Sequence, residues 1–202
     1  MIRKLAIGLF LLITAAVVAI LAIAATQPAT YHVERGITTT APPQQVFAVV
    51  NDMHRFPEWS PWEKLDPAMK TTFAGPTSGN GASYSWIGNS QAGEGRMTIT
   101  ESMPANHVAL KLEFVKPFAS TCDIHFRIEP QGDGSRVTWS MDGNNNFMGK
   151  VMCLFMNMDK MVGKDFEAGL ASLDRVSAVV PPREINAAPD SSSFDSTAAA
   201  RP

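Results

Sequence analysis

The chain has 202 residues, a formal net charge of −2 and an isoelectric point near 6.1. This length allows one domain of ordinary size with terminal extensions. The near-neutral charge excludes the strongly basic surface typical of nucleic-acid-binding proteins. The only two cysteines are Cys122 and Cys153, and their number and spacing fit neither a disulfide-rich scaffold nor a zinc motif. We expect both to be buried thiols. If the domain lies outside the cytoplasm, a disulfide between them is the alternative.

The N-terminus is the most apolar part of the chain. Arg3 and Lys4 precede a stretch from Leu5 to Ala25 that has no charged residue. As a helix this stretch is ~32 Å long, which matches the ~30 Å hydrocarbon core of a bilayer. The two basic residues favour an N-terminus in the cytoplasm and a periplasmic or extracellular domain. A cleaved signal peptide is the alternative, since residues 22–24 read Ala-Ile-Ala, but the apolar stretch is longer than a signal peptide needs.

We therefore expect a membrane anchor over residues 1–25 and a spacer over residues 26–30. The alternation in residues 31–40 then predicts a first strand. Pro42 and Pro43 open a short helix that ends near Val50, because proline is tolerated in a first helical turn.

The most distinctive local sequence runs from Asn51 to Pro67. It holds three prolines and two tryptophans, which predicts a rigid turn pinned by aromatic side chains.

Six further stretches have the alternating pattern of β-strands and are separated by turn residues. They cover residues 69–74, 82–87, 95–101, 108–115, 121–129 and 136–141. In one of them the apolar Cys122, Ile124, Phe126 and Ile128 alternate with Asp123, His125, Arg127 and Glu129. This pattern predicts an antiparallel sheet with one apolar face and one solvated face.

A long amphipathic helix is expected from about Phe147 to Val176. Its apolar residues recur at three- and four-residue steps, and the whole helix would measure ~45 Å. Its first half is rich in methionine, a flexible side chain that suits both adaptable binding sites and ordinary cores. We expect its apolar stripe and the apolar face of the sheet to bury each other. From residue 178 to residue 202 the composition changes to Pro, Ser, Ala and Asp, which predicts a disordered tail.

The order strand, short helix, tryptophan-rich turn, six strands and long helix is that of the helix-grip fold. Four local sequences agree with it, namely Phe56-Pro57-Glu58-Trp59-Ser60-Pro61-Trp62, Gly93-Glu94-Gly95-Arg96-Met97, Arg136-Val137-Thr138-Trp139 and Phe166-Glu167-Ala168-Gly169-Leu170. Over residues 31–176 the chain resembles the SRPBCC superfamily, specifically its polyketide cyclase/dehydrase and lipid transport branch. The resemblance implies an α+β domain over residues 31–177, in which a curved antiparallel sheet of about seven strands grips the C-terminal helix around an apolar cavity. It carries over no catalytic motif.

The expected lining of this cavity is aromatic and rich in methionine. It consists of Trp59, Trp62, Phe73, Tyr84, Trp86, Met97, Ile99, Leu112, Phe114, Phe126, Trp139, Met148, Met152 and Phe155. Each residue alone also fits a solid core, but the set as a whole favours a site for an apolar molecule.

Few polar residues qualify as catalytic or ligand-anchoring groups. His54 lies close in sequence to two carboxylates, which fits either a general acid–base site or a locally capped turn, and we favour the turn. Glu101 continues the alternation of Met97 and Ile99 along its strand. This places the Glu101 side chain at the rim of the cavity, and the alternative is a carboxylate that points inward and anchors a ligand. The four histidines lack metal-ligand spacing, and no hydrolase or phosphate-binding motif is present. We expect no metal and no cofactor.

The leading hypothesis is a membrane-tethered domain that binds a hydrophobic small molecule or lipid. Its partners would be that ligand and, through residues 5–25, the membrane, with no nucleic acid. The first alternative is a cyclase- or dehydratase-like enzyme, which needs a titratable group such as Glu101, His54 or His125 inside the cavity. The second is a non-catalytic envelope interaction module with a solid core. Ligand identity and oligomeric state stay open.

Overall fold

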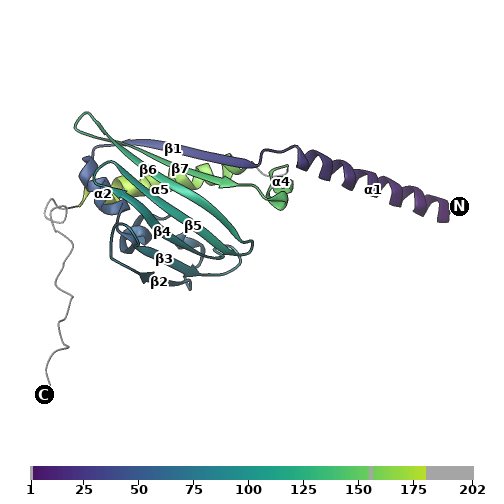
Figure 1. Ribbon diagram of the computed structural model, residues 1–202, viewed down its shortest axis with the longest axis horizontal. Coiled ribbons are helices and arrows are strands. Elements are labelled where there is room, and N and C mark those ends of the chain that lie inside the picture. Colours follow the sequence, from purple (N-terminus) through teal and green to yellow (C-terminus); the bar gives the residue numbers. More distant parts are fainter. Residues whose placement is uncertain (1, 155–156, 181–202) are drawn as a thin grey trace, which may run out of the picture.

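The computed structural model describes residues 2–154 and 157–180. At its centre is one antiparallel sheet of seven strands in the order β1-β7-β6-β5-β4-β3-β2 (Figure 1). The strands are β1 Thr30–Thr39, β2 Lys70–Ala74, β3 Ser83–Ile87, β4 Glu94–Met103, β5 His107–Lys116, β6 Ser120–Gln131 and β7 Gly134–Asn144. The prediction of an α+β fold built on a seven-stranded antiparallel sheet is confirmed.

The helices cover one face of this sheet or lie at its ends. They are α1 Ile2–Ala25, α2 Pro43–Val50, α3 Phe56–Trp59, α4 Phe147–Cys153 and α5 Met158–Ala178, with the short 3-10 helices η1 Met53–Arg55 and η2 Glu63–Leu65. The proline- and tryptophan-rich segment forms η1, α3 and η2. Asp52 caps η1, because its carboxylate accepts a hydrogen bond of 2.8 Å from the backbone N–H of His54.

The C-terminal helix is interrupted. The prediction of one continuous helix over residues 147–176 was wrong, since α4 ends at Cys153 and α5 begins at Met158. The amide oxygen of Asn157 accepts a hydrogen bond of 2.9 Å from the N–H of Lys160, and the ψ of Asn157 is 101°. An N-cap requires this extended backbone at its own position, so Asn157 starts a new helix and cannot continue the preceding one.

As a result, α4 does not share the sheet-facing stripe of α5. Its side chains Met148 and Met152 are 54% and 40% exposed. Phe155 lies outside the described residues, as do the tail residues 181–202.

The cysteines differ in their surroundings. Cys122 on β6 is a buried free thiol, as expected, and burial raises its pKa to about 11. Cys153 on α4 is also free but only half-buried, contrary to expectation, because α4 stands off the sheet.

The core lies between the apolar face of the sheet and α5. Alternating side chains of β5, β6 and β7 are buried, and α5 contributes Phe166, Leu170 and Leu173. An ion-pair cluster fixes the start of α5 on β1, where Arg35 contacts the carboxylates of Asp159 at 2.9 Å and Glu167 at 3.0 Å. These contacts hold α5 along the sheet and define the space beneath it.

Helix α1 projects from the end of the sheet at which β1 begins, and α4 lies beside its last turns (Figure 1). It is long and apolar enough over Arg3–Ala25 to cross a membrane, with a mean hydropathy of 2.9 in its most apolar window. Asn145, in the connection between β7 and α4, binds the spacer. Its backbone N–H donates to the Ala29 carbonyl at 2.8 Å and its side chain donates to the Pro28 carbonyl at 3.3 Å.

Candidate functional site

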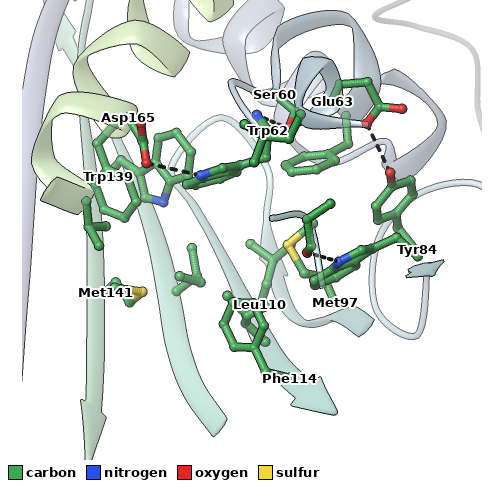
Figure 2. A pocket seen from close by; sticks show the side chains of 18 of the residues that line it. Ser60, Trp62, Glu63, Tyr84, Met97, Leu110, Phe114, Trp139, Met141 and Asp165 are labelled. Carbon is green, nitrogen blue, oxygen red and sulfur yellow. Dashed lines mark hydrogen bonds between the residues drawn. The ribbon is translucent and has the colours of Figure 1, made fainter. Parts of the chain in front are cut away.

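A cavity of about 360 Å³ lies between the sheet and the layer formed by α3, η2 and α5. This volume is typical of small-molecule sites, which measure about 300–1,000 Å³. The sheet contributes side chains such as Met97, Leu110 and Met141, and the opposite side is closed by Trp62 and the start of α5 (Figure 2). Most of the lining is apolar, so burial of apolar surface would be the main source of affinity for a ligand.

The structure brings together nine of the fourteen residues expected to line the cavity. They are Trp59, Trp62, Tyr84, Trp86, Met97, Leu112, Phe114, Phe126 and Trp139. Ile99 is buried outside the cavity. Phe73 also lies outside the cavity and packs on the lining residue Tyr84, with ring centroids 5.5 Å apart. Met148 and Met152 lie on the exposed α4.

Several lining residues were not among those expected. The apolar ones include Met53, Phe56, Leu110, Ile124, Met141 and Phe166. Leu110, Ile124 and Met141 share the strand phase of residues that were chosen, so the same alternation contains the signal for them. The acidic residues Glu63 and Asp165 also line the cavity, and no local sequence pattern marks either of them.

All four tryptophans of the protein line this cavity. Trp139 is stacked on Phe166 with ring centroids 4.1 Å apart and an interplanar angle of 10°. Trp59 and Trp62 both meet Trp139 in edge-to-face geometry, at 5.5 Å and 5.7 Å. Such contacts favour fixed ring orientations.

Gly169 on α5 permits the close approach of helix and tryptophan. A Cβ atom at this position would lie 2.7 Å from Cζ3 of Trp139 and 3.2 Å from Cδ of Pro61. The Gly169 in the sequence Phe-Glu-Ala-Gly-Leu therefore sets the depth at which α5 closes the cavity.

Two carboxylates supply the charged groups among the described lining residues. Glu63 accepts a hydrogen bond of 3.0 Å from the hydroxyl of Tyr84, and Asp165 accepts one of 3.2 Å from Nε1 of Trp62 (Figure 2). Burial, followed by the nearby Glu63 carboxylate, raises the pKa of Tyr84 above its ordinary value. The Tyr84 hydroxyl therefore stays protonated as a donor, and the charged part of the described lining is acidic.

The indole nitrogens fall into two groups. Nε1 of Trp62 donates to Asp165, and Nε1 of Trp86 donates to the Ala92 carbonyl at 3.0 Å. In contrast, Nε1 of Trp59 and Nε1 of Trp139 are buried and have no hydrogen-bond partner among the described residues.

Glu101 does not line the cavity. A β-bulge lies between Ile99 and Glu101, so the alternation that would turn Glu101 inward is broken. Its side chain is exposed, and its carboxylate lies 3.7 Å from Nδ1 of His107. The alternative that the Glu101 carboxylate points into the cavity is therefore wrong.

The histidine candidates also lie outside the cavity. His54 is half-exposed and stacks on Phe73 with ring centroids 4.2 Å apart, in agreement with the capped turn favoured above. His125 alternates with buried residues of β6 and stacks on His107 on the other face of the sheet, at 5.4 Å. The catalytic alternative thus has none of its three expected groups in the cavity. No group of three or more potential metal ligands occurs in the part of the chain that the structure describes.

The cavity opens at the end of the sheet from which α1 projects. Its exposed lining residues are Leu65, Gln91, Ser120 and Met161. Ser120 begins β6 beside the last residues of β7, and the last residue of β7, Asn144, pairs with Thr30 at the start of β1. The mouth therefore lies next to the spacer that follows α1.

Comparison with known proteins agrees with this architecture. Residues 30–178 match the family described as "Polyketide cyclase / dehydrase and lipid transport". The chain belongs to this family. The SRPBCC resemblance is thereby confirmed, and the match covers the sheet, the cavity and α5 but not α1. No curated protein matches the sequence.

Several solved structures share the fold. Protein CV1439 from Chromobacterium violaceum is 12% identical, with 75% of this chain and 98% of that chain covered and a TM-score of 0.53. Mll3558 from Rhizobium loti is 17% identical, with 74% and 99% covered and a TM-score of 0.52. The di-domain ARO/CYC StfQ from the steffimycin biosynthetic pathway is 9% identical, with 74% and 51% covered and a TM-score of 0.54. At these identities the likeness establishes the fold alone.

Proposed function

We propose that this polyketide cyclase-family chain is a membrane-tethered protein that binds a hydrophobic small molecule or lipid in the cavity beneath α5. The observation that carries the proposal is the apolar cavity of about 360 Å³ inside an otherwise packed domain. A solid core, as the interaction-module alternative requires, would leave no such space. Ordinary cores contain few voids larger than a water molecule, so an apolar space of this size favours a ligand.

The tether is supported by the surface around the mouth. Besides α1, the end of the sheet next to the spacer exposes Phe118 in the β5–β6 turn and Phe147, Met148 and Met152 on α4. Apolar side chains at a bilayer surface are covered by the headgroup and upper acyl region. A domain held there by α1 would place its cavity mouth next to a source of apolar ligands. Arg3 and Lys4 favour a cytoplasmic N-terminus and a domain on the opposite side.

The tether is tested by the mass and membrane association of the mature full-length chain. We expect an intact chain of 21.9 kDa that stays in the membrane fraction after carbonate extraction. Replacing Leu12 and Val17 with arginine should release it, because charges at the centre of a span are strongly unfavourable. A mature protein lacking residues 1–24 would instead identify a cleaved signal peptide.

Ligand binding is tested by the intrinsic fluorescence of the four cavity tryptophans. With the full-length chain in lipid nanodiscs, we expect 1-bromododecane to quench this fluorescence saturably, because the bromine would enter the cavity. Leu112→Phe, which adds volume to the lining, should weaken the quenching. Lys111→Phe is the matched control, because it adds an aromatic ring to the opposite face of the same strand. Unsaturable quenching, or equal quenching in both variants, would contradict the proposal.

A further inference from the structure

An exposed apolar surface lies on the helical side of the cavity mouth. Phe147, Met148 and Met152 of α4 are between 40% and 54% exposed. Met161 on α5 is 45% exposed and also lines the cavity. Helix α4 contains no acidic residue, and Lys150 is its one basic residue. Gathered apolar side chains beside a lysine, without an opposing acidic group, fit the interface of a bilayer better than open water.

The β5–β6 turn adds an apolar side chain on the strand side of the mouth. Phe118 in this turn is 60% exposed, and Ser120, two residues later, lines the cavity. Cys122 near the start of β6 pairs with Gly143 near the end of β7. The turn and α4 therefore lie at the same end of the sheet, which is the end from which α1 projects (Figure 1). Apolar side chains thus border the mouth on both its strand side and its helix side.

The connection between α1 and the domain is short and held by hydrogen bonds. Ala24 in the last turn of α1 is fully buried, and α4 contacts α1. The N–H of Gln27 donates to the Ala24 carbonyl at 3.1 Å, and Asn145 binds the carbonyls of Pro28 and Ala29. These contacts fix the position of α4 relative to the end of α1. If α1 spans a membrane, α4 is held at the level where the span leaves the hydrocarbon core.

We infer that α4 and the β5–β6 turn form a bilayer-docking surface, and that the cavity opens directly into the leaflet in which α1 ends. Lipid would cover Phe118, Phe147 and Met148, and a ligand would pass between bilayer and cavity without crossing water. This inference rests on the proposed function, because it assumes a membrane-spanning α1 and a cavity that holds a ligand. It adds to that function the surface that docks and the route of the ligand, since a tether alone requires neither.

Docking is tested by bimane fluorescence in nanodiscs that contain the full-length chain. The label is attached to Phe118→Cys or to Met148→Cys in a Cys153→Ser background, in which the remaining Cys122 is buried. Asp133→Cys is the matched control, because Asp133 is exposed in the β6–β7 turn at the other end of the sheet.

We expect lipids brominated in the upper acyl chain to quench the labels at residues 118 and 148 by about half or more, because apolar groups at the interface reach ~5–10 Å into the bilayer. The label at residue 133 should stay unquenched. Unquenched labels at residues 118 and 148, in a chain that membranes retain, would overturn the inference and leave the proposed function intact. Blue-shifted emission without bromine quenching would assign the surface to another protein copy and would also overturn the inference.

The route of the ligand is tested by the rate at which 1-bromododecane, added from ethanol to the same nanodiscs, quenches the cavity tryptophans. The double variant Phe118→Asp, Met148→Asp changes two residues that do not line the cavity. It should slow the quenching about tenfold, because the carboxylates oppose docking and the dodecyl chain must then cross water. The final extent of quenching should stay the same, because the two end states of the ligand do not change.

The matched control is Met103→Asp, Val179→Asp, which replaces two exposed apolar residues at the opposite end of the domain. It should leave the rate of quenching unchanged. Equal rates in the two double variants would overturn the direct route. No saturable quenching in any of these proteins, the wild type included, would overturn the proposed function itself.

Discussion

The guanidinium group of Arg35 lies directly against the backbone of Gly163. A Cβ atom at Gly163 would overlap Nη2 of Arg35, so only glycine lets this side chain cross α5. The crossing allows Arg35 to bond Asp159 on one side and Glu167 on the other. Its hydrogen bonds also lower the pKa of Asp159. Because the two carboxylates are eight residues apart, one strand is thereby fixed to about two turns' length of the helix that closes the cavity.

Gly163→Ala should destabilise the protein. In an ordinary helix interior this change stabilises by about 1 kcal/mol, because glycine is a poor helix former. Here the added methyl group displaces Arg35 from its two carboxylate partners, so we expect a lower free energy of unfolding in urea. The same substitution in an Arg35→Gln background serves as the second arm of a double-mutant cycle. If the penalty persists there, Arg35 is not its cause.

Asn157→Ala should also destabilise, by about 1 kcal/mol, the typical cost of losing an N-cap. The measurement is urea unfolding, with Asn157→Asp as the control that keeps a capping acceptor. The sign of the effect is informative, because alanine is the best helix former. If α4 and α5 formed one continuous helix, Asn157→Ala would stabilise the protein.

The His107 side chain should make the fold sensitive to acid. Burial lowers the pKa of His107 below its ordinary value of 6.5, with a smaller opposing effect from Glu101. The folded state therefore binds this proton less readily than the unfolded state. The associated stability is present above pH 6.5 and is lost as the pH falls from there through the folded-state pKa.

We expect the Tm to fall between about pH 7.5 and pH 5.5, and to fall less in His107→Gln. His32 acts in the opposite direction, since its hydrogen bond to Asp142 raises its pKa. The difference between wild type and His107→Gln isolates the contribution of His107. An identical pH dependence in both proteins would contradict this assignment.

His54→Gln and Glu101→Gln should leave ligand binding unchanged within about twofold, because both side chains lie outside the cavity and an effect below 0.5 kcal/mol is typical of such surface sites. Binding is measured by the quenching of tryptophan fluorescence described above, and Leu112→Phe serves as the sensitive reference. A tenfold loss in either variant would place the binding site somewhere other than beneath α5.

The sheet and most of its contribution to the cavity were predictable from sequence. In an antiparallel sheet with one solvated face, burial alternates at every second residue, and Cys122, Ile124 and Phe126 on β6 follow that rule. The tryptophan-rich turn was predictable because its prolines restrict the backbone. The same patterns identify Trp59, Trp62 and Trp139 as cavity residues.

The features that were not predictable depend on single residues or on contacts between distant segments. The apolar periodicity continues across the break at Asn157, and one capping side chain decides that two helices form. A β-bulge between Ile99 and Glu101 shifts the alternation of side chains along β4, so Glu101 does not point to the same face as Met97 and Ile99. Glu63 and Asp165 line the same cavity only after the helix has folded onto the turn, so no local pattern marks them as a pair.

The chain enters and leaves its domain at opposite ends of the sheet. The spacer joins β1 at the end with the cavity mouth, whereas α5 runs alongside β1 and ends near Gln45, which donates to the Val180 carbonyl. The sheet between them is long, since β6 has 12 residues and a strand of that length spans about 40 Å. A fluorescent protein or affinity tag fused directly after Val180 would therefore join the chain on the side remote from ligand entry. Such fusions offer a way to follow or immobilise the protein without obstructing the opening.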